Sequence, residues 1–128
     1  MIREALIALA VATALPAFAQ QAEIALPSGR LVTFHDSIRD DAGETLRFRF
    51  LEPDLGMVVE FVPYASLEAD MRFLCEIYAL DRLDGAASTQ IFISISDRPV
   101  EFGTQDPDAA QVFEAYRPED GACIWEGF

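Results

Sequence analysis

The sequence predicts an α+β fold: a mainly antiparallel sheet with one principal helix packed on it and tied to it by a disulfide. Three observations support this. Apolar residues alternate with polar ones in 44–51 and again in 89–96, which is the period-two pattern of half-buried strands. From Ser66 onward the apolar residues recur at helical spacing instead. Of the two cysteines, one falls on this helix and the other lies near the C-terminus.

The first half of the sheet is expected to contain three strands. Glu23–Pro27 and Arg30–Asp36 predict two strands that are separated by a Pro-Ser-Gly turn. The third strand, Glu44–Leu51, follows a polar turn at residues 40–43. One row of its side chains consists of Leu46, Phe48 and Phe50, and the other contains Thr45, Arg47 and Arg49. Arg47 and Arg49 are therefore expected on the polar face of the sheet.

The segment after this strand is expected to return as its antiparallel neighbour. Residues 52–56 contain Pro and Gly and predict a turn. Met57–Val62 is rich in β-branched residues, which favours a strand. Glu60 would then lie across from Arg47 or Arg49 on the sheet surface.

The principal helix is expected to begin at Ser66, a good N-cap residue, and to end near Leu80. Its apolar face contains Leu67, Met71, Leu74, Cys75 and Tyr78, and its polar face carries the charge ladder Glu68, Arg72 and Glu76. Cys75 thus points toward the core.

The C-terminal third contains the most strand-like segment and an ambiguous one. In 89–96 the two rows are Ile91, Ile93 and Ile95 on one face, and Phe92, Ser94 and Ser96 on the other. Val100–Phe102 forms a short strand at most. Residues 106–117 fit either a helix or a strand. We expect a helical turn at 106–111, followed by a hairpin over 113–128 that turns through a type I turn and a bulge at 118–121. On the last strand, Cys123 and Trp125 would share a face.

The N-terminal residues 1–19 have the layout of a secretory signal peptide. The uncharged run Ala5–Leu15 is too short to cross a bilayer, which needs about 20 residues. Ala17 and Ala19 supply the small residues that a signal peptidase requires, so cleavage is expected after Ala19. Residues 20–128 would then form a single exported domain in the periplasm, with no membrane insertion after cleavage.

Composition excludes some partners. The chain has 22 acidic residues against 9 basic ones and a net charge of −13. Phosphate backbones and anionic lipid surfaces would repel it, so neither nucleic acid nor a membrane surface is expected as a partner. Because the periplasm is oxidising, the two cysteines are expected to form a structural disulfide, Cys75–Cys123.

No catalytic, cofactor-binding or metal-binding motif is present. Asp36, Asp40, Asp41 and Glu44 are close in sequence but lack the spacing of a calcium-binding loop, which favours a solvated turn. His35, the only histidine, could serve as a general base, yet no nucleophile motif accompanies it. The leading hypothesis is therefore a non-catalytic module that binds an unknown protein or small ligand. The alternative is a small periplasmic hydrolase that uses carboxylates or His35.

Four side chains are candidates for a binding surface. Arg47 and Arg49 are cations on a polar strand face, and Tyr116 and Trp125 are aromatics that could stack on a ligand. Tyr64 is a further aromatic candidate if its ring is exposed.

Four segments carry a resemblance to a known family: residues 69–76, ISISDRPVEFG at 93–103, FEAYR at 113–117 and DGACIWEGF at 120–128. Together they resemble a family of small exported proteins of Gram-negative bacteria that is defined only as a domain of unknown function. Some members are labelled acetolactate synthase. That reaction needs thiamine diphosphate and a second domain or subunit, for which a chain of this length has no room. The resemblance implies an exported two-cysteine domain and no assigned site residues.

Overall fold

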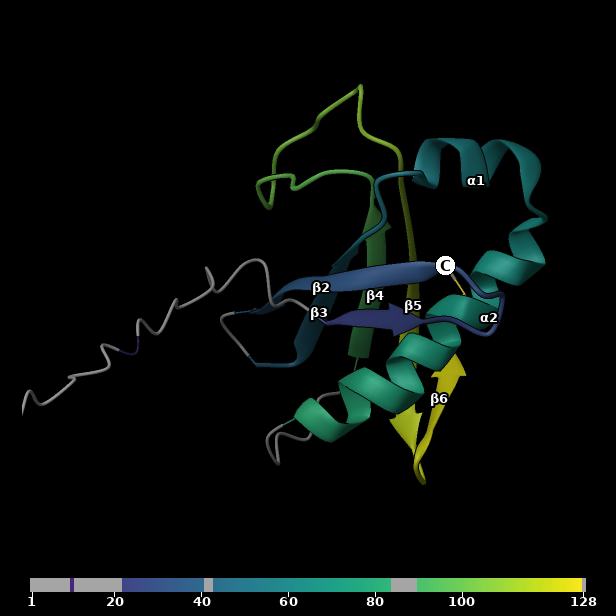
Figure 1. Cartoon of the computed structure of the whole chain (residues 1–128). Coiled ribbons are helices and arrows are strands. Elements are labelled where there is room, and N and C mark those ends of the chain that lie inside the picture. Colours follow the sequence, from purple (N-terminus) through teal and green to yellow (C-terminus); the bar gives the residue numbers. More distant parts are fainter. Residues whose placement is uncertain (1–9, 11–21, 41–42, 84–89, 128) are drawn as a thin grey trace, which may run out of the picture.

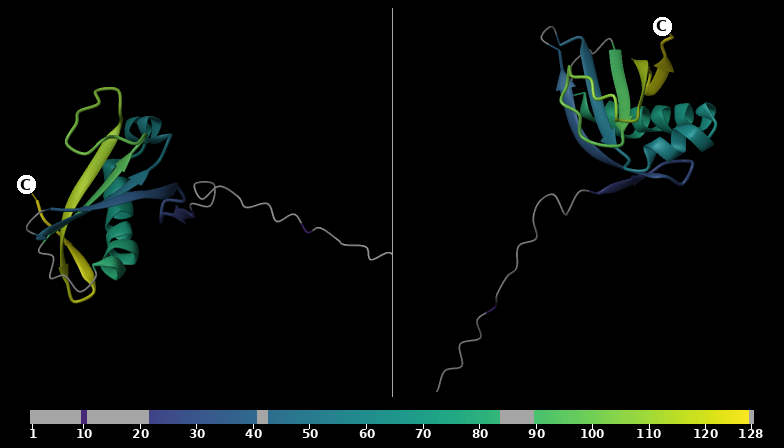
Figure 2. Two further views of the ribbon diagram at one scale, coloured as in Figure 1. Left: turned by 90° about the vertical axis from the view of Figure 1, so that its left-hand side faces the viewer. Right: turned by 90° about the horizontal axis from the view of Figure 1, so that it is seen from above.

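The computed structural model describes residues 10, 22–40, 43–83 and 90–127. It confirms the α+β class: six strands form one curled sheet, and the helices lie against one of its faces (Figures 1 and 2). The strands are β1 (Glu23–Ala25), β2 (Leu31–Arg39), β3 (Thr45–Leu51), β4 (Gln90–Ser96), β5 (Gln111–Glu119) and β6 (Ala122–Trp125). The predicted signal peptide lies outside the described residues except for Ala10. Among the described residues, no helix is long and apolar enough to span a membrane.

The sheet is mixed rather than purely antiparallel. Its strands follow chain order, β1-β2-β3-β4-β5-β6, and every neighbouring pair is antiparallel except β3 and β4. Parallel neighbours need a crossover connection, usually through a helix. The chain provides this crossover between Leu51 and Gln90, where all the helices of the described residues occur.

The prediction of a strand at Met57–Val62 was wrong, because this segment forms helix α1 (Leu55–Phe61). The turn before it starts the helix: the backbone N–H groups of Met57 and Val58 donate to the carbonyl of Asp54. Valine favours a strand where it is buried against a sheet, but in this segment only Leu55 is buried. The intrinsic preference of the two valines is therefore overridden by their position after β3. Glu60 consequently does not lie opposite Arg47 or Arg49.

The principal helix α2 (Tyr64–Leu74) begins two residues before the predicted N-cap Ser66 and follows Pro63. A π-helical segment, η2 (Cys75–Ala79), and a 3-10 turn, η3 (Leu80–Arg82), extend it. Its apolar stripe packs on one sheet face. The core contains Leu67, Met71 and Leu74 from α2, Phe48 and Phe50 from β3, and Ile91, Ile93 and Ile95 from β4. The opposite face, which carries Arg47, Arg49, Phe92 and Ser94, is not covered by helices (Figure 2).

The C-terminal hairpin is confirmed, but two local predictions were wrong. The turn has two residues, Asp120 and Gly121, both with positive φ (50° and 80°), and not a type I turn with a bulge. Residues 97–110 form a loop without a helical turn at 106–111 and without a strand at 100–102. Pro107 thus leads into a turn within this loop, and β5 begins at Gln111.

A bulge in β2 decides which face Asp36 occupies. Phe34 pairs with Phe50, whereas Asp36 pairs with Arg49, so His35 is the extra residue of the bulge. In a regular strand Asp36 would share the core face with Phe34. The bulge places it on the open face instead, directly beside Arg49.

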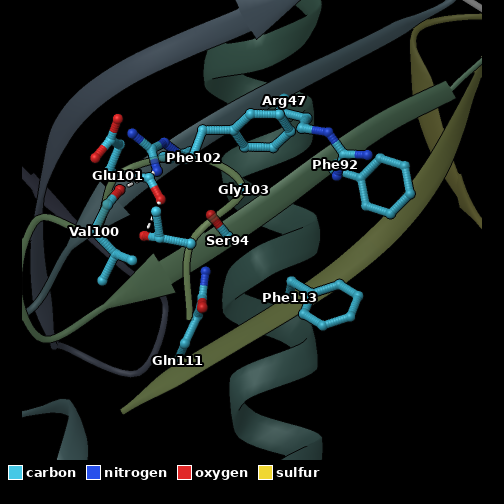
Figure 3. A pocket seen from close by; sticks show the side chains of 11 residues that line it. Arg47, Phe92, Ser94, Val100, Glu101, Phe102, Gly103, Gln111 and Phe113 are labelled. Atoms are coloured by element: carbon cyan, nitrogen blue, oxygen red, sulfur yellow. Dashed lines mark hydrogen bonds between the residues drawn. The ribbon is translucent and has the colours of Figure 1, made fainter. Parts of the chain in front are cut away.

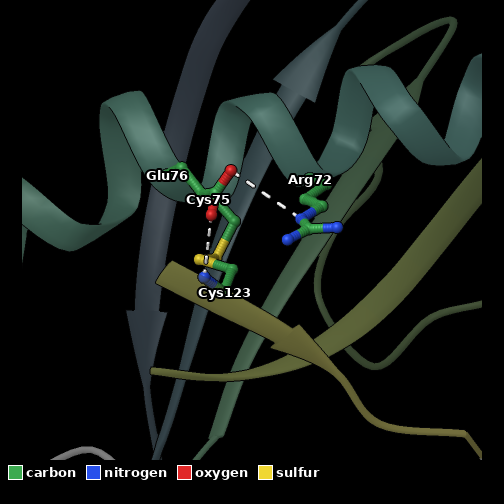
Figure 4. Close-up of a disulfide and its surroundings, with 4 residues drawn as sticks. All are labelled: Arg72, Cys75, Glu76 and Cys123. Atoms are coloured by element: carbon green, nitrogen blue, oxygen red, sulfur yellow. Dashed lines mark hydrogen bonds and ion pairs between the residues drawn. A yellow bond between two sulfur atoms is a disulfide. The ribbon is translucent and has the colours of Figure 1, made fainter. Parts of the chain in front are cut away.

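The disulfide between Cys75 and Cys123 is present and joins the first residue of η2, directly after α2, to β6 (Figure 4). Both cysteines are fully buried. Glu76, next to Cys75, accepts a hydrogen bond from the backbone N–H of Cys123 at 3.1 Å and faces Arg72 at 3.7 Å. This carboxylate thereby satisfies a backbone donor on the edge strand β6 and helps to prevent pairing with another strand.

A buried charge cluster ties the turn between β1 and β2 to the helices. Arg30 Nε donates to Glu52 at 2.8 Å, and Arg30 Nη1 lies 2.9 Å from Asp70 Oδ2. Asp70 is 1% exposed and also accepts hydrogen bonds from the hydroxyl and the backbone N–H of Ser28. The cluster links elements that are far apart in the chain.

Candidate functional site

The open face of the sheet carries a hollow, here called the sheet-face pocket, with a volume of about 240 Å³ (Figure 3). Its floor comes from β3, β4 and β5, and its rim comes from the loop 97–110. The lining residues are Arg47, Arg49, Phe92, Ser94, Val100, Glu101, Phe102, Gly103, Thr104, Gln111 and Phe113. The pocket thus contains both arginines that the sequence indicated as candidates.

Arg47 is the cation of this pocket that has no carboxylate partner in the described part of the chain. Its guanidinium carbon lies 4.2 Å from the ring centroid of Phe92 and 5.4 Å from that of Phe102. The side chain contributes to neither an ion pair nor a hydrogen bond among the described residues. Aromatic rings therefore hold the guanidinium in place, while its N–H donors remain available to a ligand.

Arg49 has a different environment and a structural role. Its Nε and Nη2 donate to the two carboxylate oxygens of Asp36, each at 2.6 Å, and its Nη1 donates to the carbonyl of Val100 at 2.6 Å. The bidentate pair fixes the orientation of the guanidinium. The third bond then attaches the loop 97–110 to the sheet, so Arg49 positions the rim of the pocket rather than offering its donors to a ligand.

The ion pair should make the position of the rim depend on pH. The hydrogen bond from Arg49 lowers the pKa of Asp36 below its ordinary 3.8, and the nearby charge of Arg49 acts in the same direction. A carboxyl with a lowered pKa stabilises the fold above its unfolded pKa, and this contribution disappears as the pH falls through the lower, folded value. We expect the backbone NMR signals of Val100 and Glu101 to stay constant down to about pH 4 and to shift below it.

Asp36→Asn is the control for this titration. The variant lacks the carboxylate, so its Val100 signal should already be displaced at neutral pH and should lose the acidic transition. A wild-type transition between about pH 5 and 7, or one that persists unchanged in Asp36→Asn, would contradict the role of the pair.

The remaining lining groups provide polar atoms, the carboxylate of Glu101 and aromatic walls. Ser94, which is 9% exposed, places its hydroxyl at the floor, and Gln111 adds an amide at the side (Figure 3). Phe102 and Phe113 are each more than half exposed. Large apolar rings exposed beside a concave polar site are a feature of ligand-binding surfaces.

Tyr116 and Trp125 do not belong to this pocket. They pair with each other across β5 and β6 on the helix-covered face. Tyr116 is buried at 1% exposure, whereas Trp125 is 58% exposed. The four candidates thus divide into two locations, one on each face of the sheet. Tyr64, at the start of α2, is 46% exposed and lies near Trp125 through a shared contact with Glu114.

The other groups considered from the sequence are not brought into a site. His35 lies at the β2 bulge, with Nε2 3.8 Å from Asp36, and no hydrogen bond among the described residues joins it to a hydroxyl. Asp36 binds Arg49, and Asp40 accepts the backbone N–H of Glu44 at 2.9 Å. Asp41 lies outside the described residues. Within residues 22–40, 43–83 and 90–127 no group of three or more metal-ligating side chains converges.

Comparison with known proteins places the chain in a family without an assigned activity. Residues 8–128 match the model of a family of unknown function, DUF6497, so the chain belongs to this family. The resemblance to a family defined only as a domain of unknown function is thereby confirmed. No curated protein and no solved structure matches the chain.

Sequence reasoning missed Phe102, Gln111 and Phe113 as pocket residues. Phe102 was expected on a short strand, and its contact with Arg47 depends on the path of a loop, which has no periodic signal. A signal for Phe113 did exist, because the hairpin register places it on the same face as Phe92 and Ser94. Treating 111–119 as one strand would have shown this.

Proposed function

We propose that this chain is a non-catalytic binding module of the periplasm that holds a small anionic ligand, a carboxylate on a planar group, in the sheet-face pocket. The observation that carries the proposal is Arg47. Its guanidinium is stacked on aromatic rings and lacks a carboxylate partner, within a chain that has acidic residues in large excess. The carboxylates of residues 22–40, 43–83 and 90–127 leave this arginine unpaired, whereas Arg49, two residues away, is paired with Asp36.

The chemistry of the pocket favours a carboxylate attached to a flat group. A guanidinium edge donates two parallel hydrogen bonds to a carboxylate, and such charge-assisted bonds contribute about 1.5–3 kcal/mol each. Phe92, Phe102 and Phe113 offer ring faces and edges to a planar body. The volume of about 240 Å³ lies just below the usual range of ligand pockets, which suits a molecule of one ring.

The cellular location is part of the proposal. The layout of residues 1–19 supports export with cleavage after Ala19, and a buried disulfide is compatible with an oxidising compartment. We propose residues 20–128 as the mature domain. The hydrolase alternative rests on carboxylates or His35. His35 lines neither of the two pockets described for this chain, so we base the function on Arg47 instead.

The test compares benzoate with benzamide, its neutral analogue of the same shape. We expect benzoate to bind roughly tenfold more tightly, because the loss of one charge-assisted interaction costs about 1.5 kcal/mol. NMR titration of the ¹⁵N-labelled protein, with the Arg47 Nε–Hε signal as the reporter, measures both affinities. The shifted backbone signals should map to β3, β4, β5 and the loop 97–110.

Two variants provide the controls for this titration. Arg47→Met keeps an apolar stem against Phe92 and should bind benzoate and benzamide equally weakly. Arg39→Met removes an exposed arginine at the end of β2 and should retain the preference. Equal binding of the two probes by the wild type, or a preference for benzoate that survives in Arg47→Met, would contradict the proposed site.

A further inference from the structure

A second hollow lies on the opposite side of the sheet, between α2 and the hairpin of β5 and β6. This helix-side groove has a volume of about 610 Å³, within the range of small-molecule pockets. Tyr116, Trp125 and Phe73 provide its apolar surface, and Glu68, Arg72 and Glu76 line it along the helix. The groove shares no lining residue with the sheet-face pocket.

The indole of Trp125 is held in a fixed orientation by one buried acid. Its Nε1–H donates to one carboxylate oxygen of Glu114 at 2.6 Å, and the hydroxyl of Tyr64 donates to the other oxygen at 2.6 Å. Glu114 is 5% exposed, whereas Trp125 is 58% exposed. Because the only polar hydrogen of the indole is already bonded, the part of Trp125 that a ligand can contact is its ring.

The charges across the groove select the ligand that would contact this ring. Glu68 forms no ion pair or hydrogen bond within the described part of the chain. Glu76 is shared between the backbone N–H of Cys123 and Arg72, whose distance from it is 3.7 Å. Glu114 lies behind the indole, so three carboxylates outnumber the one arginine. The formal charge around the groove is therefore negative, as is that of the whole chain at −13, and both favour a cation over an anion.

We propose that the helix-side groove binds an alkylammonium group of a small amine, with the cation over the Trp125 ring and near Glu68, and the alkyl stem along Phe73. Tryptophan is the best aromatic partner for a cation. The apolar walls complement methylene groups, and the free carboxylate of Glu68 complements the charge. The positive charge of Arg72 repels the cation and weakens its binding. Removal of this arginine should therefore strengthen binding.

The single tryptophan of the chain makes the test direct, because all indole fluorescence comes from Trp125. The full exported domain is titrated with cadaverine at constant ionic strength, and 1,5-pentanediol serves as the neutral analogue of the same length. We expect a saturable fluorescence change with cadaverine, with a Kd on the order of 1 mM, and none with the diol.

Charge variants give effects of opposite sign. Glu68→Gln should weaken cadaverine binding about fivefold, and Arg72→Gln should strengthen it about fivefold. Glu119→Gln, an exposed acid at the hairpin end of β5, is the matched control and should leave the affinity unchanged. All three positions are exposed, so the variants should fold, which their thermal unfolding curves verify.

Three results would overturn the proposal. The first is an equal response to cadaverine and the diol. The second is a change in the same direction for Glu68→Gln and Arg72→Gln, because a cation must respond oppositely to the loss of a negative and of a positive charge. The third is binding of a capped lysine, Nα-acetyl-lysine methylamide, without binding of cadaverine, which would assign the groove to a protein side chain instead of a small amine.

Discussion

Replacing both cysteines with alanine is expected to lower the free energy of unfolding by about 4 kcal/mol, which is the largest effect that we predict for any pair of substitutions. The disulfide closes a loop between residues 48 positions apart, so it restricts the unfolded chain strongly. Typical domains have only about 5–15 kcal/mol of stability in total. Urea denaturation of the oxidised wild type and of Cys75→Ala/Cys123→Ala measures the difference.

The slope of the denaturation curve provides an internal check. Without the cross-link the unfolded chain expands and exposes more surface, so the dependence of the free energy on urea should become steeper. Wild-type protein that is unfolded in the presence of a reductant should behave like the double variant. A decrease of less than about 1 kcal/mol would show that the disulfide contributes little to stability.

Arg30→Met is expected to destabilise the fold by about 3–5 kcal/mol. Arg30 is the cation that pairs with both Glu52 and Asp70, and its loss leaves two carboxylates buried without this partner, with Asp70 at 1% exposure. An uncompensated buried charge costs far more than the net contribution of an intact ion pair. Thermal and urea unfolding of the variant measure this cost.

The triple variant Arg30→Met/Glu52→Gln/Asp70→Asn distinguishes this explanation from a simple loss of packing. It removes the opposing charges together, so it should recover much of the stability that Arg30→Met loses. Arg98→Met is the control for loss of an arginine, since Arg98 pairs with Asp97 and donates to the carbonyl of Asp108 at the surface and should destabilise the fold far less. If the triple variant were less stable than Arg30→Met, burial of unpaired charge would not be the cause.

Much of the fold could be predicted because several strands and the principal helix have a clear hydrophobic period in the sequence. The alternation in 44–51 and 89–96 gave the strands and their faces, and the helical stripe placed Cys75 in the core, where Cys123 meets it. The parallel pairing of β3 with β4 was missed because Met57–Val62 was assigned to a strand. Valine favours strands only where it can pack on a sheet. Most residues of α1 are exposed, so this preference does not decide the structure of the segment.

The sites were less predictable than the fold. Arg47 and Arg49 were expected on one polar face, but their different partners depend on two features that have no sequence period. One is the bulge at His35, which brings Asp36 to Arg49. The other is the loop 97–110, which brings Phe102 to Arg47. Trp125 was a candidate from its residue type alone. Its hydrogen bond to Glu114 could not be predicted, because it depends on the register of β5 and β6.

Native mass spectrometry of the protein, purified without denaturation from its own host, tests whether Arg47 holds a small anionic ligand in the sheet-face pocket. We expect the oxidised wild type to carry an added mass of a small organic acid, and Arg47→Met, purified in the same way, to lack it. An identical retained mass in both proteins, or no difference between them at any ligand concentration added back, would contradict the account.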